Sequence, residues 1–193
     1  MSTHTHSGPA PHAVTIYTDG AASPNPGRGG YGAIVMRDGQ RRELSGGFNK
    51  TTNNRMEIMG AIVALRALPE RGAQVTIYSD SKYLVDMFNG GYAAKWRQAN
   101  WTRNKGKDAA LNPDLWNELL NLAAEHDVKF IWVRGHGSNL DNARCDELAV
   151  AARSAPQLPE DAGYGKLFLA KSEPPKQMSL FDESPSSFAP PPA

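Results

Sequence analysis

Four acidic residues stand at positions from which they could meet at one edge of a sheet: Asp19, Glu57, Asp80 and Asp146. Asp19 follows an alternating apolar run at residues 14–18, and Asp80 follows a second such run. Because ligands of α/β sheets gather outside the carboxyl ends of strands, two parallel neighbouring strands would bring Asp19 and Asp80 together. Glu57 and Asp146 lie within predicted helices, and each helix can present one carboxylate to that edge.

Clustered carboxylates repel one another unless they are protonated or bound to a cation. A site with only oxygen ligands suits Mg²⁺ or Mn²⁺, and such ions leave places for water and phosphate oxygens. Two ions about 3.5–4 Å apart can activate water and stabilise a leaving oxygen. The sequence contains no matching Cys/His set for zinc, no phosphate-binding loop of the Gly-x-x-x-x-Gly-Lys-Ser/Thr type and no nucleophile elbow. The four carboxylates therefore indicate metal-assisted hydrolysis.

Taken singly, each of these acidic residues has a simpler explanation. An Asp between a strand and a glycine, as at Asp19, is typical of a turn. Asp80 precedes Ser81 at a strand-to-helix junction, where helix caps are common. Glu57 and Asp146 alone would be solvated helical residues. The functional interpretation depends on all four converging.

The elements that must position these residues follow from apolar spacing and turn residues. Asp38 and Gly39 predict a tight turn between two strands, and Asn112 with Pro113 predicts a helix start with Asn as the cap. Strands are expected at residues 13–20, 31–37, 41–48, 75–79 and 129–133, and helices at about 54–72, 82–88, 113–123 and 139–153. This order predicts an α/β fold with a mixed sheet. A Gly- and Pro-rich loop is expected at residues 20–32.

At 193 residues, with 40% hydrophobic and 21% charged residues, the chain suits one globular domain with tails. We expect a disordered leader at residues 1–12, a catalytic domain at 13–154 and a Pro-rich flexible tail at 155–193. No apolar run approaches about 18 residues, which argues against a membrane span. The single cysteine, Cys145, fits a reducing, cytoplasmic location and a buried apolar position. The net charge of +1 requires segregated charges if the chain grips phosphate.

The motifs around these residues resemble those of a type 1 ribonuclease H of the bacterial kind. The matching stretches are residues 17–20, 25–27, 29–33, 51–57, 79–81, 133–137 and 142–149. The resemblance implies a ribonuclease H-like fold with a mixed five-stranded sheet and helices on both faces. It also implies internal hydrolysis of the RNA strand of an RNA–DNA hybrid, leaving 5′-phosphate and 3′-hydroxyl ends. The implied cofactor is Mg²⁺, with Mn²⁺ as an alternative and two ions in the working state.

The same resemblance assigns roles to individual residues. Asp19, Glu57, Asp80 and Asp146 match the family's metal carboxylates, and His136 matches its proton carrier or aid to product release. Since the metal does most of the chemistry, His136→Ala is expected to lose rate and keep measurable activity. The expected hybrid contacts beside the metals are Gly20, Asn25, Thr52, Asn53, Asn54, Lys82 and Asn142. For Asn53 and Asn54, helix capping alone is the alternative, and Lys82 stands where relatives often carry Gln.

Residues 95–107 resemble the family's basic protrusion, which grips the DNA strand. This segment contributes Lys95, Trp96, Arg97, Trp101, Arg103, Lys105 and Lys107. Its cations would contact phosphates and release counterions, which makes binding salt-dependent. Trp96 is expected to pack at the base of this element.

Residues 177–181 resemble the Gln-x-x-Leu-Phe peptide that binds the bacterial sliding clamp, through Gln177, Leu180 and Phe181. A chance cluster, or packing of residues 167–169 and 180–181 back on the domain, is the alternative. The expected protein is a monomer whose partners are the hybrid and this clamp. Rival functions are a resolvase or transposase of the same fold and a non-catalytic hybrid-binding or clamp-tethered module.

Overall fold

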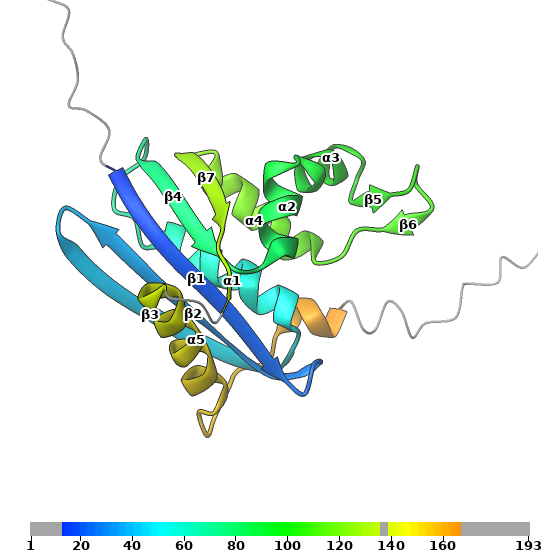
Figure 1. The fold of residues 1–193 in the computed structure, drawn as a ribbon. Coiled ribbons are helices and arrows are strands. Elements are labelled where there is room, and N and C mark those ends of the chain that lie inside the picture. The colour runs from blue at the N-terminus through cyan, green and yellow to red at the C-terminus, as the bar shows by residue number, and fades with distance from the viewer. Residues whose placement is uncertain (1–12, 136–138, 167–193) are drawn as a thin grey trace, which may run out of the picture.

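The computed structural model describes residues 13–135 and 139–166. A five-stranded sheet forms its centre, in the order β3-β2-β1-β4-β7 (Figure 1). Its strands are β1 (Ala13–Ser23), β2 (Gly27–Arg37), β3 (Gln40–Thr51), β4 (Gln74–Ser79) and β7 (Asp127–Trp132).

The sheet is mixed, as the sequence predicted. β1 pairs antiparallel with β2, and β2 with β3, whereas β4 runs parallel to both β1 and β7. Asp38 and Gly39, with φ of 51° and 76°, form the tight turn between β2 and β3. Such positive φ values suit a two-residue hairpin turn. The parallel strands are instead joined through helices, because a parallel pair needs a crossover connection.

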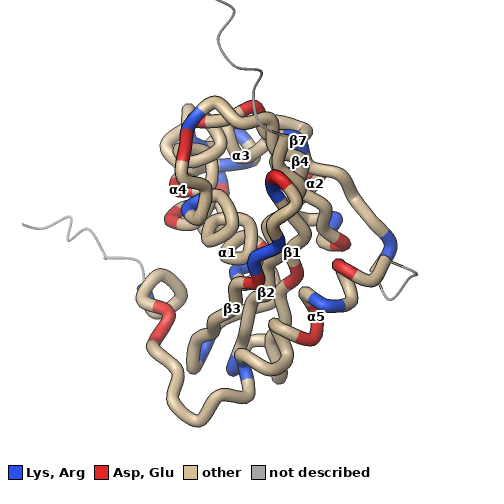
Figure 2. The backbone as a smooth tube through the Cα atoms, turned by 90° about the vertical axis from the view of Figure 1, so that its left-hand side faces the viewer, with Lys and Arg blue, Asp and Glu red and all other residues tan. Residues whose placement is uncertain are grey.

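Helices cover both faces of the sheet. In Figure 2, α1 (Asn53–Arg66) and α4 (Pro113–Ala123) lie on one side of the strands and α5 (Leu140–Arg153) on the other. Ala33 and Val35 of β2 belong to the main apolar core with α1 and α4, whereas the intervening Ile34 is buried outside that cluster. This alternation follows from the two-residue period of a strand.

Two glycines of β2 let α5 approach the sheet. An added Cβ at Gly30 would lie 2.2 Å from the Ala149 carbonyl oxygen, and one at Gly32 would lie 2.2 Å from that of Cys145. The same close packing buries Cys145 completely, which confirms its predicted core position.

A projecting lobe follows β4. It contains α2 (Lys82–Asn89), α3 (Tyr92–Gln98) and a small hairpin of β5 (Thr102–Arg103) and β6 (Asp108–Ala109). The first part of the predicted basic protrusion, residues 95–107, is therefore helical. Asn112 stands at the N-terminus of α4 as predicted, but its backbone is left-handed, with φ of 55°, and in the described structure its side chain makes no capping hydrogen bond. Capping by that side chain was a wrong prediction, since the left-handed turn directs the chain into the helix.

Two further predictions are corrected. Residues 20–32 are mostly paired strand, because β1 continues to Ser23 and β2 begins at Gly27, which leaves only residues 24–26 as the turn. Residues 155–166 were assigned to a flexible tail, but they pack against the domain. The Pro159 carbonyl accepts a 2.8 Å hydrogen bond from the Asn49 backbone, and Asp161 is buried. Among the described residues, no helix is both long and apolar enough to cross a membrane.

Candidate metal centre

Three carboxylates converge beyond the end of the β1–β4 pairing. The two parallel strands pair as far as Thr18 and Ser79, so the next residues, Asp19 and Asp80, lie next to each other. Glu57 joins them from α1, and one oxygen from each of the three residues lies within 4.8 Å of the others. The structure thus places together three of the four carboxylates that the sequence singled out, at the predicted edge.

Glu57 reaches this edge because α1 begins directly against β1. Thr52 is the N-cap residue, and its hydroxyl accepts from the Arg55 backbone N–H at 3.4 Å. An added Cβ at Gly20 would lie 2.3 Å from the Glu57 backbone nitrogen. Only a glycine at this position lets the helix pass so close to the strand.

The cluster is buried enough to disfavour negative charge. Burial first, and then the charge of Asp80, raise the pKa of Asp19 to about 7. Burial, followed by the charge of Asp19, also raises the pKa of Glu57 well above its usual value. The buried Oε2 atom of Glu57 has no hydrogen-bond partner within the described part of the chain. A divalent cation would satisfy this oxygen and neutralise the repulsion, so the donor set fits a hard, oxygen-preferring metal.

Asp146 contributes from the other face of the sheet. It lies on α5 and lines the same pocket of about 450 Å³, although it stands outside the three-residue cluster. Its charge also contributes to raising the pKa of Asp19. Asp146 is therefore the more distant member of the predicted set.

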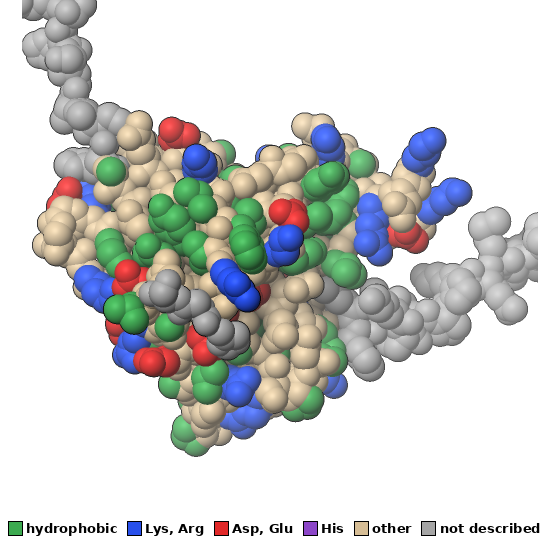
Figure 3. All heavy atoms as spheres, viewed as in Figure 1, with side chains coloured by type: hydrophobic (Ala, Val, Ile, Leu, Met, Phe, Trp, Pro, Cys, Tyr) green, Lys and Arg blue, Asp and Glu red, His purple; other side chains and the backbone are tan. Residues whose placement is uncertain are grey.

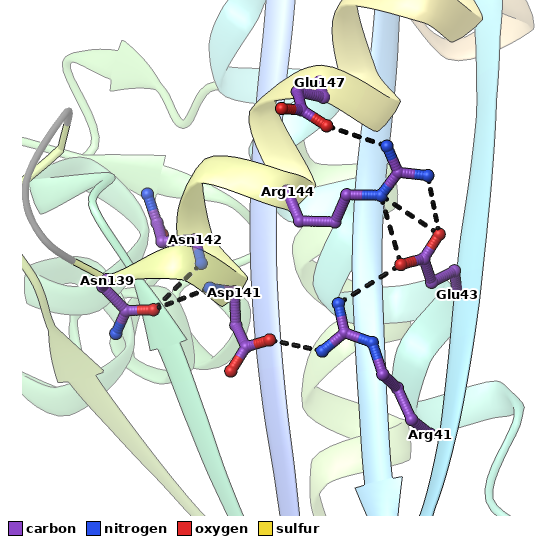
Figure 4. A network of polar contacts seen from close by, with 7 residues as sticks. All are labelled: Arg41, Glu43, Asn139, Asp141, Asn142, Arg144 and Glu147. Atoms are coloured by element: carbon purple, nitrogen blue, oxygen red, sulfur yellow. Dashed lines mark hydrogen bonds and ion pairs between the residues drawn. The ribbon is translucent and has the colours of Figure 1, made fainter.

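A polar network fixes the start of α5 (Figure 4). The Asn139 side chain caps the helix by accepting from the backbone of Asp141 and Asn142, at 3.1 and 3.0 Å. Arg41 of β3 then pairs with Asp141. Further along α5, Arg144 pairs with Glu43 of β3 at 3.0 Å. These contacts tie the helix that carries Asp146 to the sheet.

The predicted hybrid-contacting asparagines also hold the site together. The Asn53 side chain accepts from the Ala22 backbone at 2.5 Å, and the Asn25 side chain accepts from the Asn53 backbone at 3.2 Å. The tip of the β1–β2 hairpin is thereby joined to the start of α1. Asn54 is exposed. Asn142 is 3% exposed, and its Oδ1 atom has no partner among the described residues although the residue lines the pocket.

The basic segment lies on the projecting lobe, where several Lys and Arg side chains gather (Figure 3). Lys95, Arg97, Arg103, Lys105 and Lys107 are all exposed. Trp96 and Trp101 are half-buried and pack against the apolar core, which confirms that Trp96 anchors the base of this element.

Sequence reasoning missed two residues beside the site. Trp132, at the end of β7, donates its indole N–H to the Asp80 carbonyl at 3.0 Å and lies under the ammonium group of Lys82. The buried Arg55, two positions before Glu57, forms ion pairs with Asp114 and with the buried Asp161. Trp132 lies in a strand of ordinary composition, so nothing in the sequence pointed to it. Arg55 was missed because its partner Asp161 lies in the segment that was predicted to be a flexible tail. His136, Gln177, Leu180 and Phe181 lie outside the described residues.

Comparison with known proteins decides the family. The RNase H family model matches residues 11–154. The chain belongs to the RNase H family. Ribonuclease H of Trichodesmium erythraeum (strain IMS101) is 56% identical over 78% of this chain and 95% of its own length. Ribonuclease HI of Synechocystis sp. (strain ATCC 27184 / PCC 6803 / Kazusa) is 54% identical over 81% of this chain and 97% of its own.

A solved structure shares both family and fold. LC9-RNase H1, described as a type 1 RNase H with the type 2 active-site motif, is 31% identical, with a TM-score of 0.66 over 76% of this chain and 74% of its own. The five-stranded RNase H fold expected from the sequence is thus confirmed. The RNase H family is metal-dependent, in agreement with the cluster of Asp19, Glu57 and Asp80.

Proposed function

We propose that this protein is an endoribonuclease that hydrolyses the RNA strand of RNA–DNA hybrids, with Mg²⁺ or Mn²⁺ held by Asp19, Glu57, Asp80 and Asp146. The observation that carries the proposal is the convergence of three carboxylates within 4.8 Å in a buried, open-sided pocket. The products are 5′-phosphate and 3′-hydroxyl ends. Membership of the RNase H family supports the substrate.

The protein's own side chains would hold the metal and orient the attacking water. When bound, the metal neutralises the scissile phosphate and lowers the pKa of the attacking water. Asp19 and Asp80 would hold it from the sheet, and Glu57 from α1, with two ions in the working state. Asp146 faces the same pocket from α5, where its carboxylate can orient water or complete the second ion's ligands. Because Glu57 and Asp19 favour protons when no metal is present, metal binding competes with protonation at this site.

Recognition of RNA requires contacts to the 2′-hydroxyl groups. Gly20 and Asn53 line the pocket from β1 and α1, and Asn142 lines it from α5. Asn25, at the hairpin tip, and the exposed Asn54 would contact the hybrid beside them. Amide groups can both donate to and accept from a hydroxyl. Thr52 and Lys82 would meet phosphates of the hybrid, and the cations of the lobe would follow the DNA strand. His136 is proposed as an auxiliary proton carrier, which its replacement by Ala would slow without abolishing cleavage.

One assay tests the proposal. Labelled RNA–DNA hybrid, double-stranded RNA and double-stranded DNA are incubated separately with protein and Mg²⁺, alongside Glu57→Gln and the exposed-surface control Glu70→Gln. Cleavage confined to RNA of the hybrid, lost in Glu57→Gln and kept in Glu70→Gln, is expected. Cleavage of DNA by the wild type would favour a resolvase-like or transposase-like enzyme. Binding of the hybrid without cleavage would favour a non-catalytic module.

The proposal extends to one protein partner on sequence grounds alone. Gln177, Leu180 and Phe181 would bind a bacterial sliding clamp and tether the enzyme where RNA primers are left, in the cytoplasm. A pull-down in which Leu180→Ala and Phe181→Ala retain the clamp as well as the wild type does would remove this part.

A further inference from the structure

Asp80 differs from the other carboxylates because the regular pairing of its strand with β7 ends one residue before it. β4 and β7 pair as far as Ser79 and Trp132, and the Val133 N–H then donates to the Ser79 carbonyl at 3.0 Å. The next carbonyl, that of Asp80, instead accepts from the Trp132 indole at 3.0 Å. A side chain thereby continues the hydrogen bonding of the sheet by one residue, at the residue that carries the carboxylate.

Trp132 occupies an exposed position at the end of β7. It is 45% exposed, so burial of its ring contributes less to the core than that of a fully buried tryptophan. Trp132 makes two polar contacts, both near the carboxylate cluster. Its indole N–H donates to the Asp80 carbonyl, and its ring lies 5.5 Å from the Lys82 ammonium group. An aromatic face attracts a cation at this distance. Lys82 is the first residue of α2 and follows Asp80 by two positions.

Asp80 is also confined from a second direction. An added Cβ at Gly135 would lie 2.4 Å from Asp80 Oδ2. The carboxylate therefore stands between the chain at Gly135 and the backbone anchor that Trp132 supplies. A change in the position of the Asp80 carbonyl would carry the carboxylate with it.

From these contacts we infer that Trp132 is a positioning residue with two separable actions. Its indole N–H holds Asp80 in place to receive the divalent metal, and its ring holds the Lys82 ammonium, two residues after Asp80, to receive a phosphate of the nucleic acid. This inference rests on the proposed function for the identity of the metal and the substrate. The N–H of Trp132 would thus affect metal binding, and its ring would affect substrate binding.

Three variants divide the two actions. Trp132→Phe keeps a ring beneath Lys82 and removes the N–H, Lys82→Met removes the cation and keeps the N–H, and Trp132→Ala removes both. The matched control is Tyr92→Ala, because Tyr92 is 48% exposed and carries Lys95 at the same 5.5 Å, away from the carboxylates. Mn²⁺ binding to the hybrid-free protein is measured by calorimetry, and KM and kcat are measured with the hybrid.

Trp132→Phe is expected to weaken Mn²⁺ binding about threefold to tenfold, the effect of one lost hydrogen bond, and to leave KM within about twofold. Lys82→Met is expected to raise KM and leave Mn²⁺ binding unchanged, Trp132→Ala to show both changes, and Tyr92→Ala to leave Mn²⁺ binding unchanged. Circular dichroism verifies that each variant is folded.

The inference is overturned if folded Trp132→Phe binds Mn²⁺ as the wild type does, or if Lys82→Met weakens Mn²⁺ binding equally. Should Trp132→Phe fail to fold, Trp132→Leu, which has no donor in place of the N–H, replaces it for the Mn²⁺ measurement. If the wild type binds Mn²⁺ but cuts no hybrid, the proposed function fails while the calorimetry still tests the role of the N–H.

Discussion

Arg55 and Asp161 form a buried ion pair across 106 residues of sequence, with Arg55 Nε 2.6 Å from Asp161 Oδ2. The Arg55 side chain is 1% exposed and that of Asp161 5%. The same guanidinium contacts Asp114 of α4 with two further hydrogen bonds, at 2.9 and 2.7 Å. One arginine thus ties together the start of α1, the start of α4 and the segment that follows α5.

Replacing Asp161 with Asn should destabilise the fold by about 3 kcal/mol, because it leaves a buried guanidinium short of a charged partner. Asp114 stays in place, which keeps the loss at the low end of the range for buried pairs. Urea unfolding measures the change. The control Glu70→Gln removes a partner of Arg37 that is 62% exposed, and it should cost less than about 1 kcal/mol. Equal effects of the two substitutions would contradict a structural role for the Arg55–Asp161 ion pair.

The loss of folding stability at acidic pH tests the same Arg55–Asp161 ion pair. Burial by itself raises the pKa of Asp161, but hydrogen bonds from Arg55 and Thr51 outweigh it and lower the pKa overall. A carboxyl whose folded pKa is depressed contributes stability above its unfolded pKa of about 4, and that stability is lost as pH falls towards the folded pKa. Asp161→Asn should therefore cost most at pH 6 and progressively less below pH 4. A cost independent of pH would argue against the charged pair.

Asp19→Asn should separate activity from stability. Hybrid cleavage should fall by more than about 100-fold, since even residues that only support metal ligands cost about 10- to 100-fold. The metal-free protein should at the same time gain on the order of 2 kcal/mol at pH 8, because a buried repulsive charge is removed. The folded pKa of Asp19, about 7, is raised above its unfolded value of about 4, so the wild type loses stability as pH rises from about 4 to 7. Thermal unfolding in EDTA at pH 4 and pH 8 shows whether the stability gain of Asp19→Asn is small at the lower pH and large at the higher pH.

Metal binding should depend on pH for the same reason. A proton held by Asp19 or Glu57 must leave before the cation binds, so Mn²⁺ affinity should rise by up to about tenfold per pH unit below pH 7 for each proton displaced. Calorimetry in two buffers of different ionisation enthalpy counts the protons released. Affinity that is unchanged between pH 6 and pH 8 would mean that the carboxylates are already ionised without metal.

Gly20→Ala should impair the site through the backbone alone. The added methyl would meet the Glu57 backbone nitrogen at 2.3 Å, so the start of α1 must move away from β1. We expect a loss of about 1–3 kcal/mol in stability and at least about tenfold in Mn²⁺ affinity. Gly165→Ala is the control, because an added methyl there meets nothing within 4 Å.

Replacing Lys95, Arg97, Arg103, Lys105 and Lys107 together with Ala should flatten the salt dependence of hybrid binding. Each lost phosphate contact reduces the slope of log K against log salt by about 0.7 to 0.9. Arg71→Ala is the control, because Arg71 precedes β4 and so lies at the end of that strand opposite Asp80. Measuring the binding with Glu57→Gln, which is expected not to cleave, avoids loss of hybrid during the titration. An unchanged slope after the fivefold replacement would exclude the lobe as the phosphate-binding surface.

The sequence by itself determined the mixed sheet and the set of carboxylates. Strand and helix periodicity are local properties, and Asp19 and Asp80 follow directly from the strands that carry them, so their positions could be predicted before any contact was known. Cys145 was likewise predictable as a core residue. The family motifs supplied Glu57 and Asp146, whose helical positions alone give no sign of function.

Tertiary structure decided which of these groups meet and what supports them. The burial that raises the pKa of Asp19 arises only when α1 packs against Gly20, and the fourth carboxylate, Asp146, proved more distant than the other three. Asp161 was assigned to a flexible tail because composition describes a segment by its average, whereas one buried ion pair with Arg55 is enough to fix it. Trp132 gave no signal at all, since its role depends on the carbonyl of Asp80, which follows another strand. Such long-range pairings depend on how the chain packs in three dimensions, so local sequence pattern cannot specify them.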